Sequence, residues 1–447
     1  MPSGDIESQQ KGYFVSISII GLLFFIFGFV TWLNGSLIPF LKIACELNQA
    51  EAYLVSLAFY ISYTFMALPM SAVLLKTGYK NGMMLGLIGM AIGALLFIPA
   101  AHTRIYAIFL LGLFVMGAGL TILQTASNPY VVVIGPRKSA AVRIGFMGVA
   151  NKAAGILSPL IFTALMLGGI DKYSDANLKL LSPADKVIAF NHLANRLIVP
   201  YIVMAIILLF LAAMIKFSPL PELNTRDEQE GSGGTTGKKS ILQFPQLILG
   251  AIALFFYVGV EVMAGDTIGM YGKSLGISFF GKLTSYTMAF MVLGYLVGIA
   301  TIPRIIKQET ALKASAMLGF VFSLFVIFAS SANDGLSRLL LGWAGVSAVP
   351  NSVLFVALLG FANAMVWPTI WPLALDGLGK FTETGSAILI MAIAGGATIP
   401  PLYGLLSDSY SPQISYWILL PCYLAIFLYA VKGHKMREWK SVPVNQG

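Results

Sequence analysis

Two ionisable side chains interrupt apolar stretches that are long enough to span a membrane. Lys152 lies within the stretch 141–167, and Glu261 lies within the stretch 244–270, one helical turn after Tyr257. A charge at such a depth is rare, and it usually pairs with another charge, binds a cation or takes part in a proton relay. A carboxylate there can also accept hydrogen bonds from a polyol. We therefore predict that Lys152, Tyr257 and Glu261 belong to a solute site, with Glu261 and Lys152 as candidates for ion coupling.

The depth of Lys152 follows from helix geometry. Arg143 marks the inner interface, and nine residues at about 1.5 Å each place Lys152 about 14 Å into a core of about 30 Å. Two other interpretations stay open: a lysine that extends to the interface, and a structural pair with a carboxylate. Asp266, five residues beyond Glu261, is expected at the outer interface.

Buried amides form a second group of candidates. Gln124 and Asn128 are four residues apart in one apolar stretch and so share a helix face. An amide in hydrocarbon costs several kcal/mol, roughly 4–8 against an alkane, unless it is hydrogen-bonded. A neighbouring helix or a solute must therefore lie against this face, and Asn151, beside Lys152, is expected to join it.

An aromatic stripe is predicted in the stretch 350–375, where Asn363, Trp367 and Trp371 recur every four residues. Indole rings stack on the apolar faces of a sugar while an amide binds its hydroxyls. The alternative is a belt of tryptophan at the membrane interface, above all for Trp371.

The first apolar stretch carries Thr31 and Asn34 on one helix face. Asn34 is a candidate for substrate binding, and a close helix crossing through Gly35 is the competing account.

Other chemistry is not indicated. The three histidines, His102, His192 and His434, fall outside the apolar stretches, and no phosphate-binding loop, metal-ligand cluster or nucleophile–base arrangement can be recognised. We expect no enzyme and no cofactor apart from a possible Na⁺, and the sequence assigns no metal ligands.

Composition places these residues in a polytopic membrane protein. The chain of 447 residues is 57% hydrophobic and 11% charged, against about 25% charged residues in soluble proteins. The net charge of +9 is concentrated in short loops, as the positive-inside rule requires, so no nucleic-acid partner is expected. Twelve apolar stretches are long enough to span a bilayer: 13–39, 52–75, 82–100, 105–134, 141–167, 198–217, 244–270, 283–303, 311–331, 350–375, 383–402 and 415–431.

Loop charges predict the topology. With the N-terminus inside, eighteen lysines and arginines fall on inner segments and nine on outer ones, so both termini are expected in the cytoplasm. The polar start leads into an apolar stretch that is too long for a signal peptide and has no cleavage site after it, so no signal peptide is expected. In the long outer connection, SPADKVIAFNHLANRL (182–197) predicts a surface helix behind a Ser182 cap.

A charged and then Gly/Ser-rich segment divides the twelve stretches into two halves. Pro129 and Lys138 in the first half recur as Pro372 and Lys380 at an offset near 243, which indicates duplicated bundles. The alternative is that proline is simply common in membrane helices. The predicted fold is an all-α polytopic membrane protein of twelve transmembrane helices in two pseudo-symmetric six-helix bundles. Its parts are a cytoplasmic N-terminal tail (1–12), an N-terminal bundle (13–217), a cytoplasmic linker (218–243), a C-terminal bundle (244–432) and a cytoplasmic tail (433–447).

Five motifs together resemble the fucose–glucose/galactose branch of the major facilitator superfamily. They are FGFVTWLNGSLIPFLK (27–42), LQTASNPYVVVIGP (123–136), YVGVE (257–261), WPTIWPLALDGLG (367–379) and AIAGGATIPPLYGLLSD (392–408). The resemblance covers about residues 12 to 432. It implies a sugar site between two six-helix bundles at mid-membrane, alternating access, and hexose uptake coupled to protons or sodium.

The resemblance also carries over site positions and departures. Family sites fall at Gly35, Gln124, Gly148 and Asn151. The fucose–proton members have an aspartate where Gly35 stands and a glutamate where Gln124 stands, so neither position can carry a proton here. A glutamine at the position of Gln124 resembles the pattern of the glucose/galactose-like members. Gly148 replaces a glutamine, and Lys152 adds a charge that the family pattern does not contain.

From these features we expect a hexose carrier of the plasma membrane, the inner membrane in a bacterium, with a sugar, a coupling cation (Na⁺ or H⁺) and lipid as partners. We expect Gln124 and Asn151 to bind sugar hydroxyls and Trp367 to stack on the ring. The glucose-like Gln124 favours sodium-coupled symport with Glu261 near the ion path. In the rival account the Lys152 ammonium permanently takes the cation's place beside Glu261, which leaves a uniporter. Proton coupling, another polar solute such as an amino sugar, and a non-transporting sugar sensor are the remaining alternatives.

Overall fold

The computed structural model describes residues 3–133, 140–168, 170–173, 177, 181–220, 238, 240–302 and 304–439. Every regular element in this part of the chain is helical. Within it, twelve helical segments are long and apolar enough to cross a membrane, and each overlaps one of the predicted stretches. The prediction of twelve spans is therefore confirmed. The first helix begins at Ser3, so part of the predicted N-terminal tail is helical.

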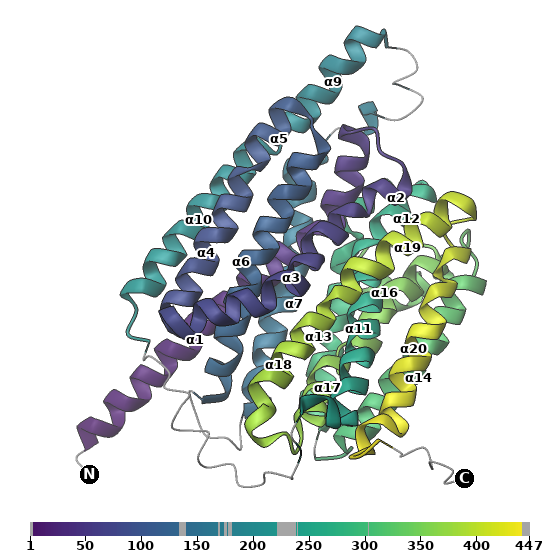
Figure 1. Ribbon diagram of the computed structural model, residues 1–447. Helices are drawn as coiled ribbons and strands as arrows, with labels where there is room; N and C mark the ends of the chain where they lie inside the picture. Colours follow the sequence, from purple (N-terminus) through teal and green to yellow (C-terminus); the bar gives the residue numbers. More distant parts are fainter. Residues whose placement is uncertain are drawn as a thin grey trace, which may run out of the picture.

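The helices form two groups that follow each other along the chain (Figure 1). The first group contains α1 (Ser3–Ala44), α2 (Gln49–Ala52), α3 (Leu54–Thr77), α4 (Tyr79–Leu95), α5 (Phe97–Thr103), α6 (Tyr106–Val133), α7 (Ala140–Met166), α9 (Pro183–Asn195) and α10 (Ile198–Phe217). The second contains α11 (Pro245–Asp266), α12 (Ile268–Ser274), α13 (Leu283–Thr301), α14 (Gln308–Phe328), α15 (Gly335–Leu341), α16 (Asn351–Asn363), α17 (Val366–Leu375), α18 (Thr382–Met391), α19 (Gly395–Ser409) and α20 (Leu419–Val431). We call these groups the N half and the C half. Most of the predicted linker lies outside the described residues.

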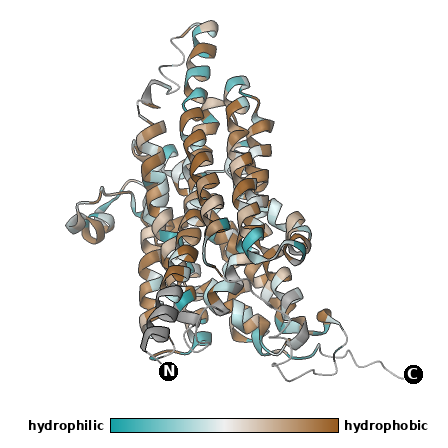
Figure 2. Cartoon of the chain, turned by 90° about the vertical axis from the view of Figure 1, so that its left-hand side faces the viewer, coloured by the Kyte–Doolittle hydropathy of each residue, from teal (hydrophilic) through white to brown (hydrophobic). Residues whose placement is uncertain are grey.

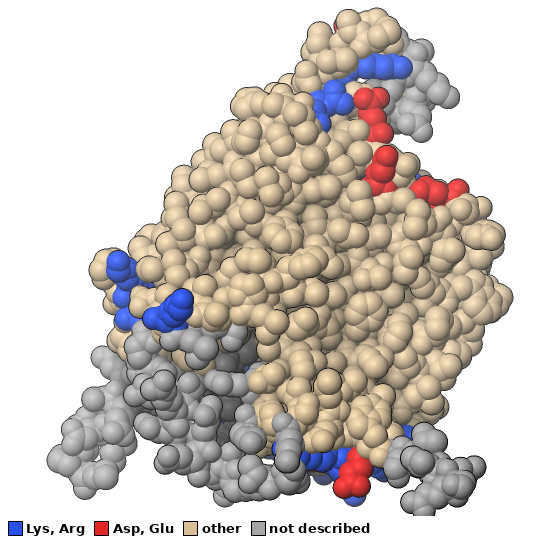
Figure 3. Space-filling model, in the orientation of Figure 1, with Lys and Arg blue, Asp and Glu red and all other residues tan. Residues whose placement is uncertain are grey.

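The surface has the distribution of charge that a bilayer requires. Lys, Arg, Asp and Glu gather toward the two ends of the molecule in Figure 3, and the broad band between them carries none on that face. Hydrophobic residues cover the helices along the face shown in Figure 2. Helices satisfy their own backbone hydrogen bonds, which is why they can cross this band. The start of α1 and the end of α20 lie on the same side of the molecule (Figure 1).

Helix α9 confirms the predicted surface helix in the long outer connection. The Ser182 hydroxyl accepts a hydrogen bond from the backbone N–H of Asp185, as an N-cap does. The helix projects beyond the bundle at the end opposite the termini (Figure 1). We call that end the outer end, in line with the predicted topology.

The two halves are joined by hydrogen bonds at the outer end. The backbone N–H groups of Gln49 and Ala50 donate to the Asp408 carboxylate at 3.2 and 3.0 Å. The Ser36 hydroxyl donates to the carbonyl of Gly281 at 2.7 Å. Helices α2 and α1 thus meet α19 and the segment before α13, and the outer end is closed.

The tenth span is broken. Helix α16 ends at Asn363, and α17 begins at Val366 after a two-residue turn. Met365 lies in this turn at φ −95° and ψ 1°, outside helical geometry. The break lies between two predicted site residues, Asn363 and Trp367.

Candidate functional site

A buried ion pair joins the two halves of the molecule. Lys152 Nζ on α7 donates to Glu261 Oε1 on α11 at 2.8 Å. Their side chains are only 9% and 11% exposed. Lys152 therefore does not extend to the interface, and both side chains are buried between the halves; their depth in the membrane stays a prediction. The structure selects the paired arrangement among the alternatives for Lys152.

The N half surrounds the lysine with an indole ring and an amide. Lys152 Nζ lies 4.3 Å from the ring centroid of Trp32 on α1, a cation–π arrangement. The indole N–H of Trp32 donates to Asn151 Oδ1 at 3.4 Å, and Asn151 Nδ2 donates to the Phe24 carbonyl at 3.3 Å. Asn151 thus holds Trp32 in place beside the ammonium.

The C half surrounds the glutamate with tyrosine hydroxyls. Tyr257, one turn before Glu261, is buried and interacts electrostatically with its carboxylate. Tyr423 interacts with both of these residues, and its hydroxyl donates to Asn363 Oδ1 at 2.9 Å. Asn363 is therefore bound to Tyr423, and no hydrogen bond joins it directly to Glu261 in the described structure.

Two more tyrosines extend the site along α3 to the predicted glutamine. Gln124 Nε2 on α6 donates to the Tyr63 hydroxyl at 3.2 Å. Tyr63 stacks with Tyr60, with ring centroids 6.4 Å apart, and Tyr60 interacts electrostatically with Glu261. Gln124 is thus linked to the ion pair through aromatic side chains.

We call the residues of this connected group the central cluster: Trp32, Tyr60, Tyr63, Gln124, Asn151, Lys152, Tyr257 and Glu261. It combines hydrogen-bond donors and acceptors with aromatic rings, and it draws on α1, α3, α6 and α7 from one half and on α11 from the other. Such a surface can bind the hydroxyls and the apolar face of a small polyol at once. It also lies where movement of one half against the other would expose it to either side.

The predicted stripe in the tenth span is interrupted by the helix break. Trp367 stacks on Trp371, with centroids 5.2 Å apart and planes at 24°, and lies 6.4 Å from Tyr257. Asn363 binds Tyr423 instead and does not continue the stripe. Trp367 remains near the central cluster, and its stacking on a sugar stays a prediction.

The remaining sequence candidates have different surroundings. Asn34 is buried, and its Nδ2 has no hydrogen-bond partner among the described residues. The side chain of Asn128 lies outside the described residues. A Cβ on Gly35 would lie 2.3 Å from Thr284 Oγ1, and one on Gly148 would lie 2.7 Å from the Tyr295 ring. Both glycines therefore serve close crossings between the halves, which is the competing account given for Gly35.

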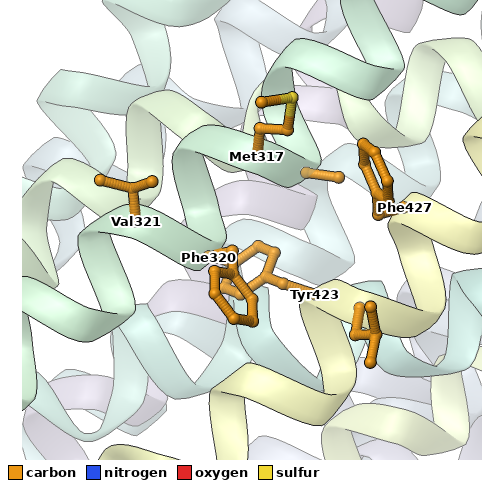
Figure 4. Close-up of a pocket in the computed structure, with 7 residues that line it drawn as sticks. Met317, Phe320, Val321, Tyr423 and Phe427 are labelled. Atoms are coloured by element: carbon orange, nitrogen blue, oxygen red, sulfur yellow. The ribbon is translucent and has the colours of Figure 1, made fainter.

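An apolar pocket on the C half does not coincide with this site. It has a volume of about 210 Å³ and lies between α14 and α20 (Figure 4). Its lining includes Met317, Phe320, Val321, Tyr423 and Phe427. No charged or amide side chain lines it, so it lacks the groups that orient a sugar.

Sequence reasoning found the charged and amide members of the cluster and missed the tyrosines of α3. Tyr60 and Tyr63 are buried side chains three residues apart. This spacing places them on one helix face, which was a usable signal. Trp32 was not among the sequence candidates, although it contacts both Asn151 and Lys152.

Sequence comparison places the chain among transporters. The profile of the Major Facilitator Superfamily matches residues 20–399. A Brucella abortus (strain 2308) protein named glucose/galactose transporter is 32% identical over 435 residues, which cover 96% of each chain. The L-fucose-proton symporter of Escherichia coli (strain K12) is 28% identical over 432 residues, with 94% of each chain covered.

Structural comparison agrees with the sequence profile. A crystal structure described as a major facilitator superfamily transporter, FucP, in the outward conformation aligns with a TM-score of 0.70 and 26% identity. The alignment covers 94% of this chain and 98% of the other. The structure of a D-xylose-proton symporter aligns with a TM-score of 0.62 at 15% identity, which bears on the fold alone. The predicted fold of two six-helix bundles is confirmed.

Proposed function

Because the chain belongs to the major facilitator superfamily of transporters, we propose that it carries a hexose of the glucose or galactose type across the membrane by alternating access. It is a multi-pass membrane protein, and in a bacterium its place is the inner membrane. The family contains transporters rather than enzymes, so the expectation of no enzymatic activity is kept.

The observation that carries this proposal is the central cluster between the halves, in a chain similar over 96% of its length to named glucose/galactose transporters. Gln124 and Asn151 offer amides, Tyr63 and Tyr257 offer hydroxyls, and Trp32 offers a ring. These groups suit the alternating hydroxyls and apolar faces of a pyranose. The relatives named L-fucose-proton symporters make a deoxyhexose the nearest competing substrate.

Sodium coupling, expected from the sequence, gains no support. The coupled relatives are named as proton symporters. In addition, Glu261 already holds the Lys152 ammonium at 2.8 Å, which is the condition set for the rival account. A tethered ammonium supplies the positive charge that a bound Na⁺ would otherwise bring to the carboxylate. We propose that transport is independent of sodium.

Uptake of labelled sugar into proteoliposomes tests the proposal. The purified protein should give saturable D-glucose uptake that D-galactose inhibits more strongly than L-fucose or N-acetylglucosamine, with equal rates in sodium and in potassium buffer. Preferred inhibition by N-acetylglucosamine would instead support an amino-sugar carrier. Glucose binding without flux would support a sensor, and a requirement for sodium would contradict the role given to Lys152.

A further inference from the structure

A second acidic residue lies between the halves, nearer the outer end and apart from the Lys152–Glu261 pair. Asp266 is the last residue of α11, and it is 0% exposed. The sequence placed it at the interface with water, but α3 of the N half covers it. The Ser56 hydroxyl on α3 donates to Asp266 Oδ2 at 2.7 Å.

The surroundings of Asp266 lack a compensating cation. Among the described residues no Lys, Arg or His forms an ion pair with it, and Oδ1 has no hydrogen-bond partner. Its titratable neighbours are Tyr53 and Tyr60 on α3 and Glu261, five residues before it on α11. Tyr416, which packs on Tyr403, is hydrogen-bonded to the adjacent Thr267. None of these can bring a positive charge, and the charge of Glu261 is already balanced by Lys152.

This arrangement favours the neutral carboxylic acid while the outer end is closed. An ionised carboxylate accepts hydrogen bonds at both oxygens and needs water or a cation, and it is costly to bury without them. A protonated carboxyl costs less to bury, because it carries no charge and the hydrogen bond from Ser56 already serves Oδ2. Glu261 differs, because the Lys152 ammonium balances its negative charge. For Asp266, binding a proton removes the charge instead.

Opening of the outer end would expose Asp266. Its cover, Ser56, belongs to the opposite half, and the same face is held shut by the Gln49–Asp408 and Ala50–Asp408 hydrogen bonds. When an alternating-access carrier separates its halves at this end, the carboxylate meets external water and can ionise. A proton that binds the closed state more tightly than the open one shifts the equilibrium toward closure.

We propose that Asp266 is the proton-binding site of the transport cycle, so that a proton enters with the sugar; this rests on the proposed function. A proton from external water bonds to a carboxylate oxygen, and the neutral acid is buried as the halves close. On the inner side that O–H bond breaks, the carboxylate is restored and the proton passes to water. We place Tyr60 on this route, because it lies one helical turn after Ser56 on α3 and its buried hydroxyl has no hydrogen-bond partner in the described structure.

The test compares wild type with Asp266→Asn, which mimics the protonated carboxyl in size and charge. Wild-type proteoliposomes in weak buffer should make the medium more alkaline when sugar is added, and external acid should raise uptake, by up to about tenfold per pH unit where the carboxyl titrates. Asp266→Asn should lose the alkaline shift, accumulation and pH dependence but keep exchange of internal for external sugar. Asp266→Glu should restore the pH dependence.

A matched control is Asp408→Asn, which removes an exposed carboxylate that also joins the halves at the outer end. It should keep sugar-induced proton uptake, even if the rate of transport changes. The proposal would be overturned if Asp266→Asn still took up protons with sugar. It would also be overturned if this variant lost both sugar exchange and active uptake. So would wild-type sugar exchange without proton movement, a result that needs no variant. Absence of hexose exchange in wild type would instead refute the proposed function.

Discussion

The buried pair between Lys152 and Glu261 gives the sharpest prediction about energetics. At 2.8 Å and an effective dielectric constant of about 20, the attraction is about 6 kcal/mol. The Trp32 ring at 4.3 Å adds up to about 2 kcal/mol when the cation is desolvated. Desolvation of two ions opposes these gains by several kcal/mol each, roughly 3–5. The pair therefore adds little net stability, but the loss of one partner leaves a buried charge uncompensated.

We expect Lys152→Met to lose about 3–5 kcal/mol of stability, and the double variant Lys152→Met/Glu261→Gln to lie within about 1 kcal/mol of wild type. A double-mutant cycle of apparent melting temperatures and denaturant midpoints in detergent gives the coupling energy. Low pH or a small cation should partly rescue Lys152→Met, because either can neutralise Glu261.

The exposed pair between Arg338 and Asp334 is the control. Its side chains are 73% and 36% exposed, so Asp334→Asn should change stability by less than about 0.5 kcal/mol. If Lys152→Met were as stable as wild type, or if the two buried substitutions were simply additive, the inference of a desolvated pair between the halves would be wrong.

Three further predictions concern the site, a helix crossing and a thiol. Gln124→Ala should weaken sugar affinity by roughly 5- to 150-fold, about 1–3 kcal/mol for a lost buried hydrogen bond, in a binding or transport assay. Gly28→Ala should destabilise the protein by at least about 1–3 kcal/mol, because the new Cβ would lie 1.8 Å from the Asn151 carbonyl oxygen. Burial raises the pKa of the Cys45 thiol to about 11, against the opposing effect of Arg104, so its alkylation by a maleimide should be slow at pH 7 and rise about tenfold per pH unit below that pKa.

Each of these three predictions has a control or a result that would contradict it. Wild-type affinity for Gln124→Ala at normal expression would remove that residue from the sugar site. Gly21→Ala on the same helix should be tolerated, because its Cβ would meet nothing closer than Met147 Cε at 3.8 Å. Equal effects at Gly21 and Gly28 would refute the crossing. Cys45 is followed in a Cys422→Ser background, and alkylation at pH 7 as fast as that of a free thiol would contradict its burial.

The fold was largely predictable because the bilayer imposes length and hydrophobicity on every span. Lys152 and Glu261 could be singled out for the same reason, since a charge stands out in an apolar stretch. Their pairing could be named only as one alternative, because the residues are 109 positions apart and meet only when the halves pack.

Other features depend on packing that hydropathy does not record. Asn363 does not continue the predicted stripe, because the helix ends at this residue and its amide oxygen accepts a hydrogen bond from Tyr423. Tyr60 and Tyr63 were not predicted, because a tyrosine can pack its apolar ring or use its hydroxyl as a hydrogen-bonding group, and its neighbours decide which. Asp266 was expected to meet water, and only the contact with Ser56 from the opposite half shows it to be enclosed.

The central claim is that this chain exchanges a hexose between the two sides of a membrane, and counterflow measures it most directly. Proteoliposomes are loaded with unlabelled D-glucose and diluted into a trace of labelled D-glucose, with no ion gradient and no sodium. The account predicts a transient accumulation of label that D-galactose suppresses and that persists in Asp266→Asn. No accumulation of any labelled hexose by folded, reconstituted protein would contradict it.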